Sequence, residues 1–117
     1  MASARVLVVG SLNADLVVRT ARIPGPGETV TGSDLMVVPG GKSANQAAAI
    51  GKLGGDVALL GCVGDDGNGT MLLNSLRDSG VDVSRVQVLP GVASGSAMIA
   101  VEDSGENSII VSPGANG

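Results

Sequence analysis

The sequence predicts an α/β fold built on a mainly parallel sheet, and three observations support this class. Continuous aliphatic runs at 5–10 and 56–63 are typical of strands that a parallel sheet buries on both faces. Segments rich in helix formers, at 42–53 and 70–79, alternate with these runs, which implies right-handed βαβ crossovers. The length of 117 residues fits a single domain, 1–117.

The elements expected in the first half are short and have glycine or proline at their boundaries. They are, in order, a strand at 5–10, an extended piece at 15–19, a loop at 23–27, strand-like pieces at 28–31 and 34–38, and a helix at 42–53. The loop cannot continue the piece before it, because proline lacks a backbone donor and glycine favours turning. Pro39 and the two glycines after it break the last strand before the helix.

The second half returns to alternating strands and helices. Its expected elements are, in order, a strand at 56–63, a loop at 64–69, a helix at 70–79 capped by Gly80, a strand at 86–89, and strands at 96–101 and 108–111 joined by a hairpin turn. The extended segments 15–38 and 96–111 do not fit within the main layers, so we expect them to project as a separate small sheet. The chain stops after a strand with no closing helix, which indicates a truncated domain.

Composition excludes several classes of function. Seven basic and 11 acidic side chains give a net charge of −4, which lacks the positive footprint of a nucleic-acid-binding protein. The absence of histidine removes an imidazole base and the ordinary zinc and haem sites, and no metal site is expected. Cys62, in an apolar stretch, is expected to be a buried, inert thiol. No apolar run approaches the ~20 residues that span a membrane, so we predict a cytoplasmic protein.

The segment GGKSANQ at 40–46 is the most informative for chemistry, because it joins a strand to a helix where main-chain N–H groups converge on a ligand. Gly41-Lys42-Ser43 matches the end of a nucleotide P-loop. The first glycine of that motif would fall at Met36, inside a strand-like run, so the spacing argues against a P-loop. A glycine-rich turn with a solvated lysine is the remaining simple interpretation.

Polar side chains near this turn favour a ligand-binding site. Asn13 and Asp15 follow the first strand, and Lys42 and Asn45 lie at the start of the predicted helix. At the carboxyl edge of a parallel sheet such positions face one crevice. A carboxylate accepts hydrogen bonds from hydroxyls and an amide both donates and accepts, so the set suits a neutral polyhydroxylated ligand better than a phosphate.

Six ordered motifs resemble the N-terminal part of the ribokinase-type carbohydrate kinases, a family of ATP-dependent sugar and nucleoside kinases. They are GSLNAD (10–15), PGETV (26–30), GGKSANQA (40–47), GDD (64–66), GEN (105–107) and PGAN (113–116). The resemblance extends from about Val6 to Asn116, nearly the whole chain. It implies a Rossmann-like half of the ribokinase fold with a protruding β lid, formed by 15–38 and 96–111, that closes over ribose and clasps the lid of a partner in a homodimer.

The resemblance also implies roles for individual residues. Asn13 and Asp15 would hold ribose hydroxyls, Gly41 and Lys42 would form the turn that approaches the sugar, and Asn45 would bond it from the helix. The apolar lid surface against the ring would come from Ala97, Ile99 and Val111. Ser43 stands where the family has glycine. A serine there caps a helix or crowds the turn.

The family supplies its ATP pocket, anion hole and aspartate base from a C-terminal half that follows these motifs. Phosphoryl transfer depends on those parts, which position and stabilise the γ-phosphate. The family uses ATP and Mg, but for this chain alone we expect no cofactor, no catalytic residue and no ribose phosphorylation. Asp65 and Asp66 form a carboxylate pair, yet neighbouring loop acids are more often solvated than catalytic.

Three interpretations remain open from the sequence. The first is a fragment that binds D-ribose or a related sugar weakly and dimerises through the lid or an exposed sheet edge. The second is a structural, self-associating α/β module with no useful ligand affinity. The third is one part of a split enzyme that needs a complementary C-terminal half.

Overall fold

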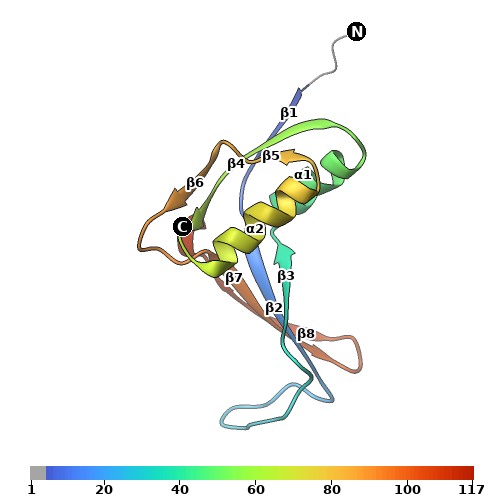
Figure 1. The fold of residues 1–117 in the computed structure, drawn as a ribbon. Helices are drawn as coiled ribbons and strands as arrows, with labels where there is room; N and C mark the ends of the chain where they lie inside the picture. Colours follow the sequence, from blue (N-terminus) through green and yellow to red (C-terminus); the bar gives the residue numbers. More distant parts are fainter. Residues whose placement is uncertain (1–4) are drawn as a thin grey trace.

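The computed structural model describes residues 5–117 and contains two sheets (Figure 1). The first, here called the core sheet, has β4 (Asp56–Gly64) beside β1 (Arg5–Val9), β5 (Val81–Asp82) and β6 (Val86–Leu89). All of its strand pairs are parallel. The predicted α/β class with a parallel sheet and βαβ units is confirmed.

Two helices, α1 (Lys42–Lys52) and α2 (Gly67–Asp78), pack on the core sheet. The buried cluster between helices and sheet is wholly aliphatic and consists of Leu12, Ala44, Ala47, Val57, Leu59, Val63, Leu72, Leu76, Val81, Val83 and Val86. Neither α1 nor any other helix in residues 5–117 is long and apolar enough to cross a membrane. On the other face of the sheet Leu7, Val9 and Leu60 are 51%, 63% and 40% exposed.

The second sheet, here called the projecting sheet, extends away from the core (Figure 1). Its strand order is β3 (Met36–Gly40), β2 (Asn13–Thr20), β7 (Gly95–Glu102) and β8 (Asn107–Ser112). The central β2–β7 pair is parallel and the two outer pairs are antiparallel. The chain closes with a short 3-10 helix, η1 (Gly114–Asn116), which lies against β4 and β7.

Several predicted boundaries were wrong. Residues 28–31 form no strand, and Pro39 lies within β3 rather than ending it. Proline is tolerated there because β3 is an edge strand that pairs only with β2. Helix α2 begins at Gly67, within the expected loop, because the Asp66 side chain accepts a hydrogen bond from Gly69 N and caps it. The short strand β5 was not anticipated.

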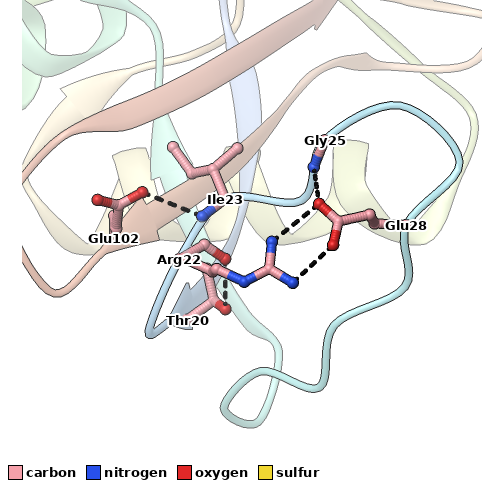
Figure 2. Close-up of polar contacts among 6 residues, drawn as sticks. All are labelled: Thr20, Arg22, Ile23, Gly25, Glu28 and Glu102. Carbon is pink, nitrogen blue, oxygen red and sulfur yellow. Dashed lines mark hydrogen bonds and ion pairs between the residues drawn. The ribbon is translucent and has the colours of Figure 1, made fainter.

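The loop after β2 is held by a compact set of polar contacts (Figure 2). The Arg22 guanidinium donates to both carboxylate oxygens of Glu28, at 2.8 and 2.6 Å, and Gly25 N also donates to Glu28, at 2.8 Å. Ile23 N donates to Glu102 of β7 at 3.0 Å. The Arg22 hydrogen bond, followed by that from Gly25, lowers the pKa of Glu28. The loop is thereby tied both to itself and to the projecting sheet.

Candidate functional site

Five of the residues proposed for sugar binding share one face of the projecting sheet. Asp15 of β2 pairs with Ala97 of β7, and Ala97 pairs with Val111 of β8. Asn13 and Ile99 stand two residues from Asp15 and Ala97 on the same strands. Because side chains alternate between the faces of a strand, all five point to the same side. We call this side the Asp15 face and the opposite side the Met98 face.

The Asp15 carboxylate lies half-buried on this face. It stands over Gly40, where an added Cβ would come within 2.3 Å of Asp15 Oδ2. Burial raises the pKa of Asp15 above its usual range. An acid in this position is a hydrogen-bond acceptor that has lost part of its water, and it is therefore suited to accept from ligand hydroxyls.

The glycine turn between β3 and α1 adjoins Asn13. Gly41 has a φ of 95°, and an added Cβ would lie 2.6 Å from Ser11 O and 3.2 Å from Asn13 N. Residue 41 is the N-cap of α1 and contributes no capping side chain. A glycine is required here because an L side chain would be strained and would clash with the chain leading into β2.

Lys42 and Asn45 begin α1 and are both exposed, on the side opposite the buried Ala44 and Ala47. They are three residues apart, and so neighbours on the helix surface. The structure thus brings together Asn13, Asp15 and Gly41, and it leaves the side chains of Lys42 and Asn45 on the first turn of the adjacent helix.

Of the two roles considered for Ser43, helix capping is not observed, because α1 has no side-chain cap hydrogen bond. The Ser43 hydroxyl donates to Val9 O at 3.4 Å, and the side chain lies against Gly10, where an added Cβ would fall 2.0 Å from Ser43 Oγ. Met36 begins strand β3, which agrees with the rejection of a P-loop cradle.

The three apolar members of the set differ in exposure. Ala97 is 6% exposed, Ile99 is half-buried and Val111 is 59% exposed. They form a graded apolar strip that starts beside Asp15 and ends at the edge strand β8. A strip of this kind next to polar groups suits the C–H face of a sugar ring.

Asp66 has a structural role that sequence reasoning missed. Its Oδ1 accepts from Gly69 N at 2.8 Å and from the Ser94 hydroxyl at 2.6 Å, and its Oδ2 accepts from Ser94 N at 2.9 Å. The Ser94 hydroxyl is the main cause of its lowered pKa. Asp65 is exposed and accepts from Gly91 N. The two carboxylates therefore have different partners: Asp66 holds the first turn of α2 and Ser94, and Asp65 is an exposed acceptor for Gly91 N.

A hollow of about 450 Å³ lies beside the site, at the carboxyl end of β1 and along the middle of β4. Cys62 lines it and is half-buried, so the expectation of a buried thiol was wrong. Asn116 lines the same hollow and hydrogen-bonds to Asn13, a contact that sequence reasoning did not assign. Within residues 5–117 no group of three or more His, Cys, Asp or Glu could hold a metal ion.

Known proteins resemble this arrangement over nearly the whole chain. Ribokinases of Schizosaccharomyces pombe and Bacillus subtilis are both 45% identical, over 96% and 95% of this chain. The structure of Arabidopsis thaliana ribokinase complexed with ribose and ATP matches 99% of the chain, with 37% identity and a TM-score of 0.87. The chain spans 37%, 38% and 38% of the length of these three relatives. Residues 3–117 match the pfkB family carbohydrate kinase model, and the chain belongs to that family.

Proposed function

We propose that this chain is the sugar-binding part of a ribokinase-type kinase and that it binds D-ribose or a related sugar weakly. One observation carries the proposal: strand register places Asn13, Asp15, Ala97, Ile99 and Val111 on a single face beside the Gly41 turn. A relative of this fold was solved with ribose and ATP. Polar groups at one end and an apolar strip at the other match a ring that carries hydroxyls on its edge.

Each group has a role that its chemistry supports. Asp15 accepts from sugar hydroxyls and Asn13 donates to hydroxyl oxygens. Gly41 lets the main chain approach the ligand, while Lys42 and Asn45 supply donors from the first turn of α1. We expect the affinity to be low because this face is only partly enclosed: Val111 is 59% exposed, so ligand hydroxyls remain in competition with water.

The 117 residues by themselves are not expected to phosphorylate ribose. They span 35% and 38% of two ribokinase structures that they match, those of Cryptococcus neoformans and Arabidopsis thaliana. Asp66, the half-buried carboxylate after β4, is engaged by Ser94 and Gly69. ATP-dependent formation of ribose 5-phosphate by the purified 117-residue chain would contradict this part of the proposal.

Two uncovered surfaces support association. The Met98 face includes Met98 and Ile110, which are 57% and 69% exposed and line a hollow of about 480 Å³. The second candidate contact surface is the face of the core sheet that exposes Leu7 and Val9, since parallel sheets are ordinarily covered on both faces. We propose that the chain forms a homodimer through the Met98 face. We propose that the face of the core sheet that exposes Leu7 and Val9 instead binds a complementary C-terminal half. A monomer mass by light scattering at micromolar concentration contradicts the dimer.

A purely structural, self-associating module is the weaker interpretation, because it gives no reason for polar residues on the Asp15 face. Ribose titration by calorimetry separates the two. We expect saturable binding to the unmodified chain, at least tenfold weaker binding to Asp15→Asn, and unchanged binding to the control Asp34→Asn, which removes an equal charge from an exposed loop. Equal affinities for the two variants would contradict the proposed role of Asp15, and no saturable binding would contradict the proposed function.

A further inference from the structure

We propose that Asn116 is a positioning residue, whose side-chain amide orients Asn13 so that Asn13 presents its N–H donors to the sugar. The inference rests on the proposed function, but its geometric part stands on contacts within the chain. Asn116 comes from η1 at the end of the described chain, 103 residues after Asn13.

The Asn116 amide is fixed by the main chain on the way into β2. Its Oδ1 accepts from Leu12 N at 3.2 Å, and its Nδ2 donates to Leu12 O at 2.9 Å. The same Nδ2 donates to Asn13 Oδ1 at 2.9 Å. Turning the amide would break both main-chain hydrogen bonds, and the freed N–H and C=O would lack water partners because Leu12 is fully buried.

The main chain around Asn116 is anchored as well. Ala115 is 6% exposed, and its N donates to Ala93 O at 2.9 Å. Asn116 N donates to Pro113 O at 3.0 Å. The side chain therefore starts from a fixed position, and its contact with Asn13 is not a chance approach of two surface amides.

Gly95 leaves the space that the two amides occupy. It pairs with Asn13 in the β2–β7 register, and an added Cβ would lie 2.1 Å from Asn116 Nδ2 and 2.5 Å from Asn13 Oδ1. Any other residue at 95 would displace one amide or the other. The Asn13–Asn116 contact thus depends on a glycine in an otherwise ordinary strand.

The consequence is a defined polarity at the site. An asparagine amide carries one acceptor oxygen and two N–H donors. Asn116 engages the Asn13 oxygen, and residues 5–117 offer no hydrogen-bond acceptor to Asn13 Nδ2, so its donors are left for a ligand. Asp15, two residues along the strand, only accepts. Asn13 as donor and Asp15 as acceptor start from positions about 7 Å apart along the strand, and they can therefore reach two different hydroxyl groups of one small sugar.

The test compares Asn116→Ala and Asn116→Asp with the control Asn107→Asp, which makes the same charge change at the exposed start of β8. Aspartate keeps the shape of the side chain but cannot donate to Asn13. We expect ribose dissociation constants about five- to tenfold higher for both Asn116 variants and an unchanged value for the control. Amide spectra that stay dispersed show that the fold is retained. A dissociation constant for Asn116→Ala within twofold of the unmodified chain overturns the proposal.

A second measurement needs neither sugar nor a variant. Side-chain ¹⁵N relaxation of the unmodified chain should show Asn13 Nδ2 as rigid as the backbone, with nuclear Overhauser contacts between the Asn116 Nδ2 protons and Gly95. A freely rotating Asn13 amide, or no such contact, overturns the positioning role even if the Asn116 variants fail to fold. Rigid amides in a chain that does not bind ribose support the positioning geometry while contradicting the proposed function.

Discussion

Replacing Asp66 by alanine tests whether the carboxylate after β4 supports the fold. Its three hydrogen bonds connect the first turn of α2 with Ser94, which precedes β7. Ser94 is 3% exposed, and its hydroxyl accepts in turn from Gly64 N at 2.9 Å. The substitution therefore uncaps α2 and leaves buried Ser94 groups without their acceptor.

The expected loss follows from these contacts. An N-cap contributes about 1 kcal/mol, and hydrogen bonds to a charged acceptor contribute about 1.5–3 kcal/mol. Asp66→Ala should therefore lower the free energy of unfolding by about 3 kcal/mol, or the melting temperature by about 10 °C in a domain of this size. Asp65→Ala, which removes an exposed acceptor of one main-chain N–H, should cost about 0.5 kcal/mol.

Urea denaturation followed by circular dichroism measures both variants under the same conditions. The midpoint should fall strongly for Asp66→Ala and very little for Asp65→Ala, with similar slopes. If the two losses are equal, or if Asp66→Ala is as stable as the unmodified chain, then Asp66 does not hold α2 to Ser94. The reasoning from its hydrogen bonds would be refuted.

Three further predictions concern pH, the glycine turn and association. Because the pKa of Asp66 is lowered in the folded state, its contribution to stability is present above its ordinary pKa of 3.8 and is lost as the pH falls through the lower native value. Asp66→Asn should therefore flatten the acidic part of a plot of urea midpoint against pH. An unchanged slope in that range contradicts the prediction. Gly41→Ala, at a φ of 95°, should cost about 2 kcal/mol by the same assay, against no measurable loss if the turn tolerates a side chain. Ile110→Lys should give a monomer by light scattering while Leu7→Lys does not, and the reverse result would place the dimer contact on the core sheet.

Much of the fold follows from local sequence. The helix expected at 42–53 is observed at Lys42–Lys52, and the strand expected at 56–63 is observed at Asp56–Gly64, because alanine-rich and β-branched runs favour these states directly. The errors arose where long-range contacts decide. Pro39 is tolerated by its place on an edge strand. Helix α2 starts early because Asp66 caps it through Gly69 N, and Ser94, 28 residues away, holds the same carboxylate in place.

The candidate site could be predicted in part for similar reasons. Alternation along β2 places Asn13 and Asp15 on one face, and this can be read from the sequence. The sequence does not show which residues of β7 and β8 lie opposite them, because register is a tertiary property. Asn116 was missed for the same reason, since its partner lies 103 residues earlier in the chain.

The central claim is that one face of the projecting sheet binds a sugar. A two-dimensional amide NMR titration with millimolar ribose tests it most directly. The account predicts saturable shifts at Asn13, Asp15 and Ala97 and at the Gly41 turn, with little change at Met98 and Ile110 on the other face. Dispersed signals that do not move, or shifts confined to the Met98 face, would contradict it.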